Sequence, residues 1–183
     1  MAQFDSCINY VLGHEGGLTE DKNDPGGITN FGISLRFLRE VDTDTLKRAG
    51  IFDEVTSKTI IDLTLDQAKS LYFSEFWNKG PFDKIQNGIL AKYILDMCVN
   101  MGNAEAVKLV QRACCAAQKI KDYVKDDGVF GSETLSAVNR ASFMLMPALI
   151  ATRAAYYRQL VAMNPKLSVF FNGWLERVFD ISY

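Results

Sequence analysis

The fold class is indicated by residues 87–118, NGILAKYILDMCVNMGNAEAVKLVQRACCAAQ. Apolar and small residues recur at helical spacing on both sides of Gly102, so we expect one helix over residues 87–101 and a second over residues 103–118. Small and apolar side chains are typical of buried helices, and the glycine between the two patterns ends the first helix. This stretch therefore predicts a helical core.

Helical patterns continue on the N-terminal side of this stretch. An apolar stripe that begins at Phe4 predicts a helix ending near Gly13. Ser34 is a suitable N-cap for a second helix, and Thr64 and Gln67 have the spacing of a capping box ahead of a third. Each cap supplies a side-chain oxygen to a backbone N–H that has no partner within the helix.

Helices are also expected on the C-terminal side. Ser132 is expected to cap a helix that ends near Met146. Pro147 suits the first position of the next helix, to about residue 163, because that position does not need the N–H that proline lacks. A last helix is expected over residues 167–178.

These patterns predict a mostly α fold with a short β-hairpin near residues 18–32, where two glycines are flanked by Thr and Ile. The length of 183 residues suits one domain or two fused lobes. The helical pattern is weakest at residues 78–88, NKGPFDKIQNG. We therefore expect two lobes, residues 1–86 and 87–183, that share one core.

Composition limits the expected partners. The net charge of -2 and the charged fraction of 23% lack the excess of one sign that marks nucleic-acid binders. Residues 1–80 hold 8 Lys and Arg against 13 Asp and Glu, and residues 81–183 hold 12 against 9, so the second half is better suited to an anionic ligand. No window has the roughly 18 apolar residues of a membrane span, and the N-terminus lacks the features of a signal peptide. We expect synthesis in the cytoplasm, no nucleic-acid partner and no membrane span.

Metal and cofactor sites are not expected either. The four cysteines are Cys7, Cys98, Cys114 and Cys115. They include an adjacent pair but no CxxC spacing, which favours buried, reduced thiols over zinc ligands. The loops around Gly26 and Gly128 lack the ligand pattern of a calcium-binding EF-hand, and no hydrophobic strand precedes the N-terminal glycines as a nucleotide fingerprint requires.

The N-terminal glycine-rich loop is the best candidate for chemistry. Its sequence is GHEGGLTEDKNDPGGITNFGIS, residues 13–34. Glu15 follows the end of the first expected helix, where the negative end of the helix dipole disfavours an ionised carboxylate. Asp24 lies nine residues later in a loop that Pro25 stiffens, and Thr29 adds a hydroxyl that can orient a water. A protonated acid and a second, ionised carboxylate are the groups that glycoside hydrolysis needs.

The same loop is compatible with a simpler interpretation. Glu15 and Asp24 would then be solvated surface residues, and the glycines would serve only to end a helix and to form a turn. Acidic, glycine-rich loops are common on protein surfaces, so spacing alone favours this simpler interpretation.

Blocks along most of the chain, however, resemble those of the glycoside hydrolase family 108 muramidases. In chain order the blocks are EGG (15–17), NDPGGITNFGIS (23–34), YFSEFW (72–77), LDMCVNMG (95–102), VQRA (110–113), DGVFGSET (127–134), RAAYYRQL (153–160) and FNGWLERV (171–178). Each block alone is weakly specific. Their number and order favour an enzyme over a surface loop.

The resemblance implies a lysozyme-like helical fold and cleavage of the β-1,4 bond between N-acetylmuramic acid and N-acetylglucosamine in peptidoglycan. The catalytic acid of the family is the glutamate of EGG, which is Glu15 here. Phage-type lysozymes, a more distant likeness, use an Asp nine residues after the Glu and a Thr six residues further on. Asp24 keeps the first interval, whereas Thr29 follows Asp24 by only five residues.

The second half resembles the peptidoglycan-binding module that accompanies these enzymes. The resemblance therefore implies that the partner is peptidoglycan, bound through its glycan strands and their stem peptides. We expect the protein to be a monomer. The place of action would be the periplasm or cell wall. The blocks look most like the typhoid-toxin-secretion type, with phage endolysins as relatives. A lytic transglycosylase and a catalytically inactive peptidoglycan-binding protein are the alternatives.

Three further residues are candidates for contact with the substrate. Asp96 and Asn100 are four residues apart on an expected helix and share a face, from which they could reach an N-acetyl or peptide group. They are equally compatible with a buried polar pair that is satisfied within the protein. Trp77 could stack on a sugar ring, although core packing is the more frequent role of a tryptophan.

Overall fold

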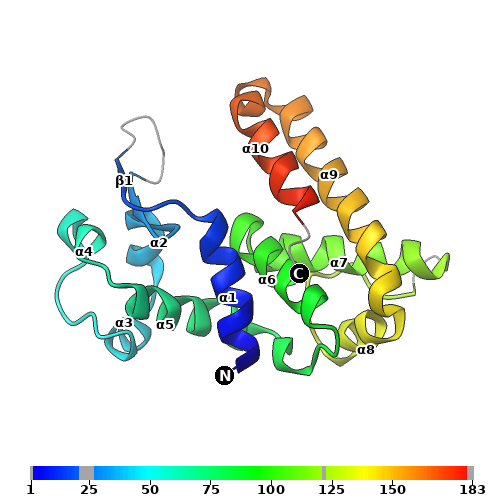
Figure 1. The fold of residues 1–183 in the computed structure, drawn as a ribbon, viewed down its shortest axis with the longest axis horizontal. Helices are drawn as coiled ribbons and strands as arrows, with labels where there is room; N and C mark the ends of the chain where they lie inside the picture. Colours follow the sequence, from blue (N-terminus) through cyan, green and yellow to red (C-terminus); the bar gives the residue numbers. More distant parts are fainter. Residues whose placement is uncertain (1, 21–26, 121–122, 181–183) are drawn as a thin grey trace. The chain divides into compact units, whose positions relative to one another are not determined.

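The computed structural model describes residues 2–20, 27–120 and 123–180, and it is mostly helical, as expected (Figure 1). The chain divides into two compact units, Met1–Lys79 and Gly80–Tyr183. The division falls inside the weakly patterned stretch 78–88, slightly before the expected lobe boundary.

The first unit consists of short helices and a small antiparallel sheet. Its elements are α1 (Ala2–His14), β1 (Thr19–Glu20), β2 (Ile28–Asn30), β3 (Ile33–Ser34), α2 (Leu35–Glu40), α3 (Thr43–Arg48), α4 (Ser57–Ile61), α5 (Leu65–Glu75) and η1 (Trp77–Lys79). β2 is the central strand, and Thr29 in it pairs with Thr19 of β1 and with Ser34 of β3. The expected hairpin is therefore present and is extended by a third strand.

Side-chain caps begin several of these helices. The hydroxyl oxygen of Ser34 accepts the N–H of Phe37 at 3.1 Å at the start of α2. Thr64 and Gln67 form a capping box at the start of α5, so both predicted caps are confirmed. The sequence does not predict α3 or α4, because six and five residues are too few for a helical period to stand out.

The second unit is built around a long central helix. Its elements are η2 (Phe82–Lys84), α6 (Gly88–Met101), α7 (Asn103–Gln118), α8 (Ser132–Ala141), η3 (Ser142–Met144), α9 (Leu145–Met163), η4 (Pro165–Leu167) and α10 (Ser168–Phe179). α7 packs against α6, α8 and α9, and α9 packs against α10. The buried residues of α7 include Ala106, Val110 and Ala113, whose small side chains allow helices to approach closely. α7 begins and ends at the predicted residues, and Gly102 separates it from α6 with a φ of 85°.

The start and end of α8 differ from the sequence prediction. Ser132 is the first residue of α8 and not its cap, and Gly131, which precedes it, has no side chain with which to cap the helix. α8 ends at Ala141 and not near Met146, because Ser142 has a φ of 47°, which an α-helix cannot continue through.

The segment Ser132–Met163 contains α8, η3 and α9, and it is long and apolar enough to cross a membrane by length and composition alone. No such segment is expected from the sequence. The core helix of a globular domain meets the same criterion, and α9 packs on both α7 and α10. α9 begins at Leu145, so Pro147 is its third residue and not its first. That position is still within the first turn, where a backbone N–H has no helical partner.

All four cysteines are free thiols, and Cys7, Cys98 and Cys114 are buried, as predicted, whereas Cys115 is partly exposed. Burial raises the pKa of the Cys98 and Cys114 thiols to about 12. These thiols are therefore neutral at physiological pH and serve as small apolar core residues.

Candidate active site

Glu15 directly follows the last residue of α1. Its backbone N–H donates to the carbonyl oxygen of Val11 at 3.2 Å, so the main chain at Glu15 still follows the helix. The residue is half-buried. The ring of Phe4 in α1 packs edge-on against Phe73 and Trp77, with centroids 5.0 and 5.4 Å apart. Glu15 therefore lies at the end of a helix that an aromatic cluster fixes to α5 and η1.

A two-residue turn connects β2 and β3. Asn30 pairs with Ile33 across it, which leaves Phe31 and Gly32 as the residues of the turn. Their φ angles are 51° and 75°. Two consecutive positive φ angles give a hairpin turn a twist that matches the twist of its strands. A phenylalanine rarely adopts this conformation, so the turn depends on contacts that stabilise it.

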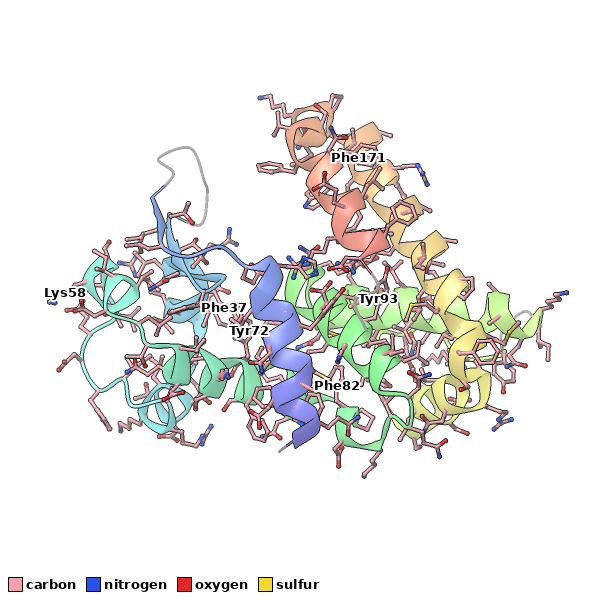
Figure 2. All side chains as sticks on the ribbon, viewed as in Figure 1. Phe37, Lys58, Tyr72, Phe82, Tyr93 and Phe171 are labelled. Atoms are coloured by element: carbon pink, nitrogen blue, oxygen red, sulfur yellow. The ribbon has the colours of Figure 1, made fainter. Side chains whose placement is uncertain are left out.

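Two side chains connect this turn to the helices of the first unit. The buried side-chain amide of Asn30 donates to the carbonyl oxygen of Ile60, the second-last residue of α4, at 3.0 Å. The hydroxyl of Tyr72 in α5 donates to the carbonyl oxygen of Phe31 at 2.9 Å; Figure 2 labels Tyr72. These hydrogen bonds offset the backbone strain at Phe31.

Gly32 is the point at which Glu15, Tyr72 and the turn meet. A β-carbon at position 32 would lie 2.6 Å from Oε2 of Glu15 and 2.6 Å from the hydroxyl oxygen of Tyr72. Real β-carbons do not approach other atoms so closely, so glycine alone leaves enough room here. The carboxyl group of Glu15 therefore lies against the backbone of the turn, close to Tyr72.

Neither Gly32 nor Tyr72 is among the site residues expected from the sequence. Gly32 lies within the block NDPGGITNFGIS and Tyr72 begins the block YFSEFW, so the family resemblance offers a signal for both residues. Tyr72 is 41 residues from Phe31 along the chain, and no local pattern predicts a contact between them.

Of the other two expected catalytic residues, the structure describes only Thr29. Asp24 lies outside the residues that the structure describes. Thr29 lies in the central strand and is half-buried, whereas its neighbours Ile28 and Asn30 on the opposite face are buried. The roles of Asp24 and Thr29 stay predictions from the sequence.

In the second unit, Asp96 belongs to a buried ionic cluster. Its carboxylate accepts hydrogen bonds from Nε and Nη2 of Arg177 at 2.9 and 2.7 Å, and Nη2 of Arg153 lies 2.8 Å from its other oxygen. The side chains of Asp96 and Arg153 are both 0% exposed. Asn100, one turn further along α6, accepts a hydrogen bond from the hydroxyl of Tyr157. Asp96 is thus a buried residue whose hydrogen bonds are made within the protein, and the half-buried Asn100 also has a partner there. Contact of either residue with the substrate stays a prediction.

Trp77 is also buried in this structure. It is 7% exposed, and its ring packs against Phe4 within the first unit. This arrangement favours core packing over stacking on a sugar ring.

The DGVFGSET block forms a turn that is hydrogen-bonded to Gln111 of α7. The side-chain oxygen of Gln111 accepts the N–H groups of Asp127 and Gly128 at 3.1 and 2.9 Å. Its nitrogen donates to Oδ1 of Asp127 at 2.9 Å and to the hydroxyl oxygen of Thr134 at 3.0 Å. The N–H of Val129 also donates to Oδ1 of Asp127. The side chains of Asp127 and Thr134 are therefore engaged in forming the turn itself.

A mostly helical unit with a half-buried glutamate placed against a β-turn is the arrangement expected of a lysozyme-like fold, and comparison with known proteins supports this fold class. The profile of the family described as "Glycosyl hydrolase 108" matches residues 8–102, and that of "Predicted Peptidoglycan domain" matches residues 105–179. A solved structure, described as "Structure of Brucella abortus SagA", is similar to this chain with a TM-score of 0.74 and 29% sequence identity. The match covers 98% of this chain and 91% of that one. A search of curated proteins finds no match.

The chain belongs to the glycosyl hydrolase 108 family. With its peptidoglycan domain, it is a glycoside hydrolase that acts on peptidoglycan. The family match includes α6, which the structure places in the second unit, so the boundary between the two matches falls one helix after the structural division.

Proposed function

We propose that this chain is a lysozyme-type N-acetylmuramidase in which Glu15 is the general acid that protonates the glycosidic oxygen. The bond cleaved is the β-1,4 bond between N-acetylmuramic acid and N-acetylglucosamine. The observation that carries the proposal is the contact of the Glu15 carboxyl group with the turn at Gly32, within the region that matches the hydrolase family. A general acid must be held at one place beside the bond that breaks, and this contact is suited to that.

Two further roles in the reaction are proposed from the sequence. Asp24 activates or positions the attacking water, and Thr29 orients it, because hydrolysis of a glycoside needs a second polar group on the face opposite the acid. The second unit selects glycan strands through their stem peptides. The match of residues 105–179 to a peptidoglycan domain supports this role.

The biological role that we propose is local opening of the cell wall. The enzyme would act in the periplasm or wall and would enable release of a toxin or another protein, or lysis of the phage type. The resemblance of the blocks to the typhoid-toxin-secretion type supports this role.

The test is digestion of purified peptidoglycan followed by mass spectrometry of the soluble fragments. Fragments that end in a reducing muramic acid are the expected result. Reducing N-acetylglucosamine ends would show that the other glycosidic bond is cut, and 1,6-anhydro ends would identify a lytic transglycosylase. Binding to peptidoglycan from several sources, without release of any fragment, would identify an inactive binding protein.

A further inference from the structure

We infer that Tyr72 and Gly32 are positioning residues for Glu15: Tyr72 fixes the hairpin turn, and Gly32 leaves the space in which the Glu15 carboxyl group is held. This inference rests on the proposed role of Glu15 as the general acid. Neither residue is assigned contact with the substrate.

Tyr72 is held in place by its neighbours. The residue is 2% exposed, and its ring lies 5.7 Å from that of Phe76, which in turn stacks on Phe37 of α2 at 5.9 Å. The hydroxyl therefore has little freedom to move apart from α5, and its proton is engaged by the carbonyl oxygen of Phe31. Tyr72 thus fixes the turn relative to α5.

Glu15 is connected to α5 through α1. The position of α1, which ends at the residue before Glu15, is fixed relative to α5 by the contact between Phe4 and Phe73. The turn, the tyrosine hydroxyl and the helix that leads to Glu15 are therefore held together within the first unit. A β-carbon at position 32 would lie 2.6 Å from both Oε2 of Glu15 and the hydroxyl oxygen of Tyr72, so these two groups border the space that Gly32 leaves open.

Displacement of Glu15 has an expected kinetic signature. A displaced general acid lowers the rate of the chemical step, by up to roughly a hundredfold for a misplacement of about 1 Å. No part in substrate binding is assigned to these contacts. Loss of positioning should therefore lower kcat and leave KM nearly unchanged.

Tyr72→Phe removes one hydroxyl and keeps the buried ring. We expect kcat to fall about tenfold or more, within the effect of such misplacements, with KM within a factor of about two. Tyr93→Phe is the matched control, because the Tyr93 hydroxyl is also buried and also donates to a backbone carbonyl, that of Val178, at 2.9 Å. The control should show a similar fall in melting temperature with kcat unchanged.

Gly32→Ala places a methyl group where Glu15 and Tyr72 now lie, and it should lower kcat more than Tyr72→Phe does. Gly50→Ala is its control, since Gly50 has nearly the same φ, 76° against 75°, but the nearest atom to its β-carbon would be 3.8 Å away. If Gly32→Ala does not fold, the pair of tyrosine variants still decides the question.

Glu15→Gln, measured alongside, separates the two proposals. If Glu15→Gln is inactive and Tyr72→Phe retains the wild-type kcat, the positioning role is overturned and the proposed acid stands. If Glu15→Gln retains wild-type activity, the proposed acid is wrong and the positioning role is overturned with it. A fall in kcat of Tyr93→Phe equal to that of Tyr72→Phe would show a general effect of stability and would also overturn the positioning role.

Discussion

The two units each contain a glycine-dependent turn that a helix side chain holds in place, but the turns differ in what occupies the space at the glycine. A β-carbon at Gly32 would collide with the carboxyl group of Glu15, whereas one at Gly128 would lie 2.9 Å from the backbone carbonyl oxygen of Ala104. Tyr72 holds the first turn, and Gln111 holds the second. The first glycine makes room for a reactive group, and the second makes room for the main chain.

This difference shows how to interpret glycine-rich motifs in this chain. In the DGVFGSET turn, the side chains of Asp127 and Thr134 both accept hydrogen bonds from Gln111, so the block stabilises the second unit. At the Gly32 turn, the group packed against the glycine is a carboxyl that a glycosidase can use as an acid. Substitutions at the first turn should therefore alter activity, and those at the second should alter stability.

The largest expected effect is that of Glu15→Gln. Turnover should fall about a thousandfold, which corresponds to roughly 4 kcal/mol of transition-state stabilisation, because an amide cannot act as the acid. Binding to peptidoglycan should remain, and the melting temperature should change little. Rates are measured by release of soluble fragments, and binding is measured by co-sedimentation with inactivated walls.

Glu40→Gln is the control for this substitution, because Glu40 is exposed and its ion pair with Arg36 is a surface contact of 3.5 Å. It should retain wild-type activity. A Glu15→Gln variant with more than about a tenth of wild-type turnover would fall outside the effect of a general acid and would contradict the proposal.

The second effect is a loss of stability at the other turn. Gln111→Ala should lower the free energy of unfolding by about 3 kcal/mol, because Gln111 is buried and its loss leaves the N–H groups of Asp127 and Gly128 without that partner. Urea unfolding at neutral pH measures this change. Gln118→Ala on the same helix is the control and should change the free energy by about 0.5 kcal/mol or less.

The activity of Gln111→Ala tests whether the turn of the second unit affects catalysis. Turnover per folded molecule should stay near the wild-type value, because the hydrogen bonds of Gln111 hold the turn of the second unit, whereas Glu15 lies in the first. A large loss of kcat in a fully folded variant would show that the turn of the second unit also affects catalysis. This result would contradict the proposed difference between the two turns.

The third effect distinguishes the two glycines directly. Gly128→Ala should destabilise the protein by about 2 kcal/mol, since alanine is strained at a positive φ and its methyl group would meet a backbone carbonyl. Gly50→Ala has nearly the same φ, 76° against 75°, but the nearest atom to its added carbon would be 3.8 Å away, so we expect about 1 kcal/mol. Neither variant should change kcat, in contrast to Gly32→Ala. Equal destabilisation by both would show that the contact with Ala104 does not matter.

Much of the fold could be predicted from the sequence because its signals are local. The capping box at Thr64 and the helix break at Gly102 depend on neighbouring residues, and both are confirmed. The end of α8 could not be predicted, because Ser142 adopts a positive φ that no serine prefers intrinsically. For the site, the motif identifies Glu15, but the contact between Tyr72 and Phe31 joins residues 41 apart and follows from tertiary packing.

The smallest expected effect is on the pH dependence of stability at the second turn. The backbone N–H of Val129, followed by the side chain of Gln111, holds the pKa of Asp127 below its usual value. A carboxyl whose pKa is lower in the folded protein stabilises it above the unfolded pKa of about 4, and this contribution is lost as the pH falls through the folded pKa. Asp127→Asn keeps an oxygen that can accept both hydrogen bonds but removes the charge.

Wild type should therefore be more stable than Asp127→Asn at pH 7, and the difference between their urea midpoints should shrink below about pH 4. Asp42 offers the same test in the first unit, since it caps α3 by accepting the N–H of Thr45 at 2.9 Å, and that hydrogen bond lowers its pKa. Asp42→Asn should show the same sign of pH dependence with unchanged kcat. A difference that persists at low pH for Asp127→Asn but not for Asp42→Asn would mean that the introduced amide fails to replace the carboxylate in the hydrogen bonds to Gln111 and Val129. The geometry of those bonds, and not the charge, would then distinguish the DGVFGSET turn from an ordinary helix cap.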